Sequence, residues 1–195
     1  MRRGLVHIAV AFATLVAPAA GEADGATVSA RVHAASARCD GADTIPGQDP
    51  ASDVRDATLC LMNAQRTARG LPRLRAHSAL ELAATRYARQ MVRDQFFAHS
   101  SPGGSTMVAR IKAASYLKDV LRWTVGENLA WGTGTQSTPR ATVEAWMRSP
   151  DHRANLLDRD FEDVGIGVAT GAPDALEDGE TAGTYVTDFG SRVRR

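Results

Sequence analysis

Apolar residues recur at three- and four-residue steps along two long segments, a spacing that predicts two amphipathic helices. The first helix is expected to begin near Asp53 and to end at Gly70, which Pro72 follows. The second is expected to begin at Ser78, with Glu81 three residues later as in a capping box. The apolar positions are Val54, Ala57, Leu61, Ala64 and Ala68 in the first helix and Leu80, Ala84, Tyr87, Ala88 and Met91 in the second.

Turn and cap signals divide the next part of the chain into shorter elements. Val108 and Ile111 predict a short helix after the Pro-Gly-Gly turn at 102–104. Residues 123–131 are expected to run as an extended strand toward a Gly/Thr/Ser loop. Thr-Pro at 138–139 and Ser-Pro at 149–150 each place an N-cap residue before a proline at the first helical position, so two helices should follow one another.

Two β stretches close the chain, at 164–169 and 184–189, and both are rich in β-branched or aromatic residues. The polar loop between them is too short for a crossover helix, which favours antiparallel pairing. Helices gathered around a small antiparallel sheet make an α+β sandwich.

The N-terminal segments have a different character from the rest. Arg2 and Arg3 precede a short apolar run and the small residues Ala17-Pro18-Ala19, which is typical of a secretory signal peptide over 1–20. A single membrane anchor is the alternative, and no other stretch is apolar enough to span a bilayer. Residues 21–52 lack helical or strand periodicity and are interpreted as a flexible leader, followed by one domain over 53–190. We therefore expect a secreted, extracellular protein without stable membrane insertion after cleavage.

Composition and charge exclude one class of partner. The 195 residues are 44% hydrophobic and carry a formal net charge of +1. Cleavage of the signal peptide would leave the chain close to neutral. No basic run interleaved with aromatic residues occurs, so nucleic-acid binding is not expected.

The two cysteines of the chain, Cys39 and Cys60, both lie outside the predicted signal peptide. An even pair in an exported protein usually forms a disulfide, which would join the irregular leader to the first helix. Two unpaired thiols are the alternative. We expect the pair to be bonded, with α-carbons within about 7 Å of each other.

Two histidines and two glutamates are the candidates for chemistry. His99 and His152 each lie at the edge of a predicted helix beside a turn, where side chains often face a cleft. Glu127 falls on the predicted strand and Glu144 on a predicted helix. Neither HExxH nor CxxC occurs, so spacing alone leaves open whether these four side chains converge on a metal or are solvated separately. His77, just before a helix, is expected to be a solvated surface residue.

Two further readings of the sequence remain as alternatives. Ser100 and Ser101 stand beside His99, but the G-x-S-x-G elbow of serine hydrolases is missing. Trp123, Trp131 and Trp146 are candidates to line a ligand groove, although large aromatic residues at element edges more often belong to a core.

Four segments of the chain resemble the bacterial branch of the CAP superfamily, which takes in cysteine-rich secretory proteins, insect antigen 5 and plant pathogenesis-related proteins. The segments are FFAHSSPGGSTMVARI, VGENLAWG, AWMRSPDHRANLLDRDFEDVGIGVA and TYVTDFG, and the resemblance runs from about Val54 to Phe189. It implies a three-layer α-β-α sandwich. It also implies a cleft tetrad of two histidines and two glutamates, which fall on His99, Glu127, Glu144 and His152.

The resemblance implies a site but no single reaction. In some members of the superfamily the two histidines hold a divalent metal, often zinc, so His99 and His152 are the expected metal ligands. The glutamates act there on bound water, which makes Glu127 and Glu144 the candidate catalytic residues. The eukaryotic GHYTQVVW signature and the Cys-rich extension are absent, so sterol binding and channel modulation are not carried over.

Three functions follow from these expectations. The leading one is a secreted binding module, expected to be a monomer, whose cleft holds zinc or another divalent cation and an unidentified extracellular or cell-envelope ligand. The second is a metal-assisted, peptidase-like hydrolase that uses the same cleft. The third is a purely structural tetrad, in which each glutamate holds a histidine in one tautomer.

Overall fold

A computed structural model describes residues 7–11, 25–176 and 180–194 of the chain. Its elements, in chain order, are β1 (His7–Ala11), α1 (Gly25–Ser36), α2 (Ala51–Thr67), β2 (Arg75–Ala76), α3 (Ser78–Asp94), α4 (Met107–Ala113), β3 (Val120–Thr133), the 3-10 helix η1 (Gly134–Ser137), α5 (Pro139–Arg148), α6 (Pro150–Leu157), β4 (Asp163–Thr170) and β5 (Ala182–Arg194).

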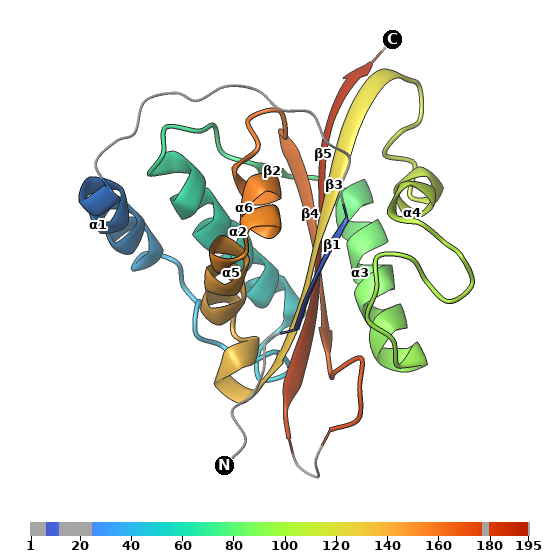
Figure 1. The fold of residues 1–195 in the computed structure, drawn as a ribbon, viewed down its shortest axis with the longest axis horizontal. Coiled ribbons are helices and arrows are strands. Elements are labelled where there is room, and N and C mark those ends of the chain that lie inside the picture. The colour runs from blue at the N-terminus through green and yellow to red at the C-terminus, as the bar shows by residue number, and fades with distance from the viewer. Residues whose placement is uncertain (1–6, 12–24, 177–179, 195) are drawn as a thin grey trace.

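The strands form one sheet between two layers of helices. The strand order is β1-β3-β5-β4-β2, and neighbours are antiparallel except for β2 and β4. Helices α2, α5 and α6 lie on one side of the sheet, and α3 and α4 lie on the other (Figure 1). The structure therefore confirms the expected α+β, three-layer α-β-α sandwich with a small, mainly antiparallel sheet.

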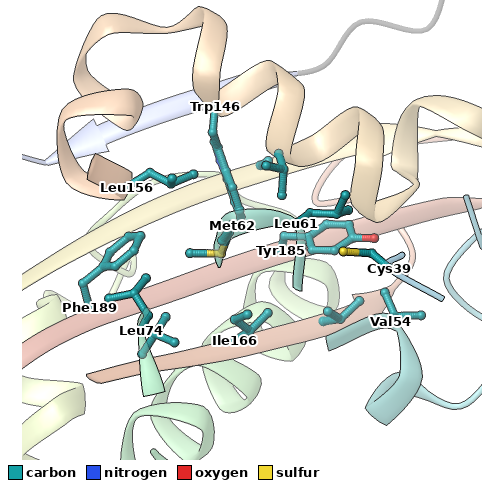
Figure 2. Close-up of a cluster of buried hydrophobic side chains, with 14 of the residues drawn as sticks. Cys39, Val54, Leu61, Met62, Leu74, Trp146, Leu156, Ile166, Tyr185 and Phe189 are labelled. Carbon is teal, nitrogen blue, oxygen red and sulfur yellow. The ribbon is translucent and has the colours of Figure 1, made fainter. Parts of the chain in front are cut away.

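The larger core lies between the sheet and the layer of α2, α5 and α6. Trp146, Met62, Tyr185 and Phe189 are fully buried there, with further aliphatic side chains around them (Figure 2). Burying one large apolar side chain stabilises a fold by about 1.5–3 kcal/mol. This cluster therefore accounts for much of the attachment of α5 and α6 to the sheet.

On the opposite face, α3 packs directly on the backbone of β4. A Cβ added at Gly165 would lie 2.0 Å from the carbonyl carbon of Leu80, and one added at Gly167 would lie 2.2 Å from that of Ala84. Both contacts are with backbone, which cannot move aside as a side chain can. Glycine at these two positions therefore allows α3 to approach the sheet closely.

Most of the predicted helix starts agree with the structure, with one shift. Thr138 caps α5, because its Oγ1 accepts the amide N–H of Ala141 at 3.2 Å. The N-cap of α3 is His77 and not Ser78, since Nδ1 of His77 accepts the amide N–H of Ala79 at 3.2 Å. The expectation that His77 is merely a solvated surface residue was wrong, because the ring is half-buried and closes the helix end.

Two N-terminal elements were not expected. Residues 25–36, predicted to be part of a flexible leader, form α1, which is rich in alanine, the strongest helix former. Residues 7–11, within the predicted signal peptide, form β1 and pair with Glu127–Trp131 of β3. The rest of the predicted signal peptide, at 1–6 and 12–20, lies outside the described residues. Cleavage of the signal peptide after residue 19 stays a prediction. It would remove β1 and leave β3 at the edge of the sheet.

The disulfide prediction is confirmed. Cys39 and Cys60 are bonded, with their α-carbons 5.6 Å apart, and the bond ties the segment after α1 to α2. In the described part of the chain, no helix is both long enough and apolar enough to cross a membrane.

Candidate functional site

The centre of the candidate site is a hydrogen bond between His99 and Glu127. His99 follows α3, whose last turn ends at Gln95 in the left-handed conformation, and Glu127 lies on β3. The imidazole Nδ1 is 2.7 Å from Oε1 of Glu127, whose side chain is fully buried. An ionised carboxylate only accepts hydrogen bonds, so the imidazole donates from Nδ1. The ring is thereby held in one tautomer, with Nε2 left as the acceptor.

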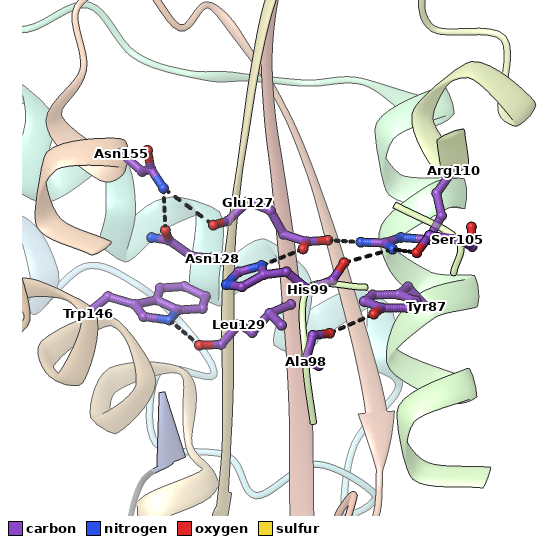
Figure 3. Close-up of polar contacts among 10 residues, drawn as sticks. All are labelled: Tyr87, Ala98, His99, Ser105, Arg110, Glu127, Asn128, Leu129, Trp146 and Asn155. Carbon is purple, nitrogen blue, oxygen red and sulfur yellow. Dashed lines mark hydrogen bonds and ion pairs between the residues drawn. The ribbon is translucent and has the colours of Figure 1, made fainter. Parts of the chain in front are cut away.

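Arg110, on α4, holds the other oxygen of Glu127. Its Nη2 forms an ion pair with Oε2, and its Nη1 donates to the backbone carbonyls of His99 and Ser105, both at 3.1 Å (Figure 3). The guanidinium also lies 3.3 Å from the centre of the Tyr87 ring, a cation–π contact. One arginine therefore fixes both the carboxylate and the loop that carries His99.

Tyr87 completes the support of that loop from α3. Its hydroxyl donates to the carbonyl of Ala98 at 2.6 Å (Figure 3). Burial raises the pKa of Tyr87 to about 12, so the hydroxyl stays protonated and continues to donate at neutral pH. The backbone on the N-terminal side of His99 is therefore anchored to the helix that packs on β4.

A second buried carboxyl group, Asp188 on β5, lies against Glu127. The two residues are register partners on adjacent strands, and their side chains are within hydrogen-bonding reach. Asp188 is fully buried, and among the described residues no donor reaches either of its oxygens. Burial first, and then the charge of Glu127, raise the pKa of Asp188 well above its usual range, with Arg110 acting in the opposite sense. Because two carboxylates cannot bond to each other, the raised pKa favours Asp188 as the member of the pair that carries a proton.

His152 lies in the first turn of α6 and is fully buried. Its Nδ1 is 2.7 Å from Oγ of Ser149, which explains why Ser149 does not cap the helix with its side chain. The backbone carbonyl of His152 accepts from Nδ2 of Asn128 at 3.0 Å, and Asn155 bonds to the side chain of Asn128 at 2.9 Å. Helix α6 is thereby attached to β3 at the residue next to Glu127.

Glu144 is placed differently from the other three predicted residues. It lies on α5 with an exposed side chain, 3.8 Å from Arg148 one helical turn later. Such a surface pair contributes little to stability. In the described part of the chain, no three or more His, Cys, Asp or Glu side chains are grouped closely enough to hold a metal ion. The structure thus joins His99 with Glu127 and leaves Glu144 at the surface. His152 lies on α6, which is attached to β3 beside Glu127.

Comparison with known proteins agrees with this fold. The sequence profile of the cysteine-rich secretory protein family (CAP) matches residues 59–186, more than half of the chain. The chain belongs to this family. The uncharacterized protein YkwD of Bacillus subtilis (strain 168) is 34% identical to this chain over 107 residues, which are 55% of this chain and 39% of the relative.

Two solved structures resemble the CAP domain described here. One is an extracellular protein containing an SCP domain from Bacillus anthracis, with a TM-score of 0.55 and 22% identity over 76% of this chain and 45% of that one. The other is an outer surface protein of Borrelia burgdorferi, with a TM-score of 0.50 and 25% identity over 68% of this chain and 87% of that one. The chain therefore spans less than half the length of the Bacillus relatives it matches, and these likenesses support its fold.

The side chains around His99 supply only part of a donor set for a metal ion. Nε2 of His99 is buried and has no hydrogen-bond partner among the described residues. A carboxylate on the other ring nitrogen is the usual second partner of a metal-binding imidazole. His99 therefore fits one ligand position, but catalytic zinc usually has three protein ligands. The described residues do not fit a complete, permanently occupied metal centre.

Three residues of the site were not found from the sequence: Tyr87, Arg110 and Asp188. Tyr87 lies on the predicted apolar stripe of the second helix, and that pattern gives no sign of a role in the site. Asp188 carried a weak signal, since it is a charged residue inside a strand that is otherwise buried. No signal singled out Arg110, which is one arginine among many.

The remaining candidates have structural roles. Oγ of Ser101 accepts the amide N–H of Ser105 at 3.0 Å and so closes a turn, which does not support a serine-hydrolase role. Trp146 is buried in the core and donates from its indole to the carbonyl of Leu129 at 3.2 Å. Trp131 is also largely buried, whereas Trp123 is exposed. The core interpretation therefore holds for two of the three tryptophans.

Proposed function

We propose that this CAP domain is an extracellular binding module whose ligand-contacting atom is Nε2 of His99. The observation that carries the proposal is the fixed orientation of this ring. Glu127 holds Nδ1, Arg110 holds Glu127, and Nε2 remains buried without a hydrogen-bond partner in the described part of the chain. A buried polar atom without a partner is uncommon in folded proteins, and a bound ion is one of the partners that can satisfy it.

The ligand that this nitrogen favours is a divalent cation, with zinc as the first candidate. A neutral imidazole is a common zinc ligand, and the carboxylate on Nδ1 increases its basicity. We propose His152 as the second imidazole; its Nδ1 is 2.7 Å from Oγ of Ser149. Two imidazoles and no carboxylate ligand bind zinc weakly, so the cation is expected to bind reversibly or together with a larger ligand.

The proposal favours binding over metal-assisted hydrolysis because of how Glu127 is held. Both of its oxygens are engaged, one by His99 and the other by Arg110. A general base must offer a free lone pair to the proton it removes. The remaining lone pairs of Glu127 belong to a fully buried side chain that also lies against Asp188, and Glu144 points into solvent. We therefore assign Glu127 the role of a positioning residue.

The expected location is outside the cell. The sequence predicts a signal peptide, and the two structural relatives are described as extracellular and outer-surface proteins. An exported location also suits the disulfide, which persists in oxidising compartments. The extracellular or cell-envelope ligand that accompanies the cation is not specified by the site.

Zinc titration by calorimetry tests this proposal. The protein is compared with His99→Ala and with His33→Ala, a control that removes an exposed histidine of α1. We expect zinc binding to disappear in His99→Ala and to persist in His33→Ala. Circular dichroism verifies that each variant is folded. Equal zinc binding by the protein and by folded His99→Ala would contradict the assignment of Nε2 as the binding atom.

A further inference from the structure

Strands β3 and β5 continue beyond the rest of the sheet as a two-stranded ribbon. The last residue of β5 that pairs with β4 is Gly190, opposite Asp163. We call the remainder the ribbon tip: residues 120–124 of β3 and 191–194 of β5. In Figure 1 the ribbon tip extends past both helical layers toward the C-terminus. The sequence patterns predicted one strand that begins at residue 123 and another that ends at residue 189, so the extension of both strands was not expected.

Exposed apolar side chains are concentrated on the ribbon tip. Of the four large hydrophobic residues that are exposed in the described chain, three lie here: Leu121 at 60%, Trp123 at 43% and Val193 at 48% exposed. The fourth is Leu82 of α3, at 42%. Single exposed apolar residues are common on protein surfaces, but three among the nine residues of the ribbon tip indicate an interaction surface.

The apolar side chains point to both faces of the ribbon. Trp123 is opposite Arg192 in the register, and the next pair along the strands is Arg122 with Val193. Since neighbouring residues of a strand point to opposite faces, Trp123 and Val193 are on different sides. A folded protein partner would cover one face and leave the other in water. The fluid interface of a lipid bilayer surrounds a narrow ribbon on both faces at once.

The charges of the ribbon tip favour an anionic lipid surface. Arg122 and Arg194 are exposed, and within the described chain neither has an ion-pair partner. A cavity of about 530 Å³ lies along the ribbon between Arg122 and the hydroxyl-bearing residues Thr124 and Ser191. An arginine beside hydroxyl groups is chemistry that suits a phosphate oxygen.

We propose that the ribbon tip inserts into the interface of a membrane that contains anionic phospholipid. Trp123 and Leu121 enter the headgroup region, where tryptophan is enriched in membrane proteins. Arg122 and Arg194 contact lipid phosphates, and Val193 enters from the other face. Binding of this kind combines buried apolar area with attraction to anionic lipid. The ribbon tip is separate from the His99 site, so this inference stands independently of the proposed function.

Vesicle sedimentation tests the inference with the processed protein, whose N-terminus is verified by mass spectrometry. Vesicles of phosphatidylcholine alone are compared with vesicles that also contain phosphatidylglycerol. The test variants are Arg122→Glu with Arg194→Glu, and Leu121→Ser with Trp123→Ser. The matched controls are Arg86→Glu with Arg89→Glu, an equal charge change on the exposed side of α3, and Leu82→Ser. All substitutions are at exposed positions, and circular dichroism verifies folding.

We expect the protein to bind vesicles with phosphatidylglycerol and to bind less at high salt. Neutralising one arginine near such a surface corresponds to about a fivefold loss of affinity, and reversing two charges should remove more. The serine variants should also bind more weakly, and the controls should match the unmodified protein. Four results would overturn the inference: no vesicle binding, equal binding to both lipid compositions, equal losses in the controls, or complete competition by soluble glycerol phosphate.

Discussion

The buried pair of Asp188 and Glu127 gives the sharpest prediction about stability. We expect Asp188 to hold a proton in the folded protein, because burial and the charge of Glu127 raise its pKa well above the usual range. In the unfolded chain the same group has the ordinary pKa of an aspartate, about 3.9. Replacing Asp188 with asparagine removes the titration while keeping the shape and one donor for Glu127. The two proteins should therefore differ in how their stability depends on pH.

The sign and size of the difference follow from proton linkage. Below pH 3.9 or so, Asp188 is protonated in both states and adds no pH dependence. At higher pH the unfolded state loses this proton and the folded state keeps it. The free energy of unfolding then falls by up to about 1.4 kcal/mol per pH unit, until the pH reaches the pKa of the folded state. The asparagine of Asp188→Asn does not titrate, so the free energy of unfolding of this variant should rise with pH relative to that of the unmodified protein.

Urea denaturation across the range from mildly acid to neutral pH measures this difference directly. The control is Asp160→Asn, which makes the same change at an exposed aspartate in the loop after α6 and leaves the buried pair intact. A difference between the protein and Asp188→Asn that stays constant with pH would refute the reasoning. It would mean that Asp188 is ionised in the folded state, and that the two carboxyl groups do not share a proton.

Two further predictions concern the supports of the site and of the fold. Arg110→Leu should lower the free energy of unfolding by about 3–5 kcal/mol, because it leaves the charge of Glu127 buried without its partner. Urea denaturation measures this loss, and a loss below about 1 kcal/mol would contradict a buried ion pair. Replacing Cys39 and Cys60 with serine should lower the free energy of unfolding by about 3 kcal/mol, the value for a closed loop of this length. A melting temperature that the replacement leaves unchanged would show that this bond does not constrain the unfolded chain.

Much of the fold was predictable because it rests on local signals. The Thr-Pro and Ser-Pro pairs at 138–139 and 149–150 mark the starts of α5 and α6, since an N-cap and a proline act on the backbone next to them. The element α1 was missed because its residues form a helix by intrinsic propensity, with little apolar periodicity to reveal it. The pairing of β1 with β3 was missed because strand pairing joins residues that are far apart in the chain.

The candidate site was less predictable, because its contacts connect distant segments. Spacing placed His99 and Glu127 in separate elements, and only the family resemblance brought them together before the structure did. Asp188 could not be placed without the register of β3 on β5, which positions it opposite Glu127. Arg110 could not be placed because its role depends on the path of the loop after His99. The exposed position of Glu144 likewise depends on how α5 is rotated on the core.

The central claim is that Glu127 holds the His99 ring with its proton on Nδ1 and offers Nε2 to a ligand. Heteronuclear NMR of the imidazole nitrogens, recorded at alkaline pH before and after zinc is added, tests this most directly. The account predicts a protonated Nδ1 and an unprotonated Nε2 in the free protein, with zinc shifting the Nε2 resonance. It also predicts that Glu127→Gln mixes the two tautomers, because the amide can donate or accept. A proton on Nε2 in the free protein, or resonances of His99 that zinc leaves unchanged, would contradict it.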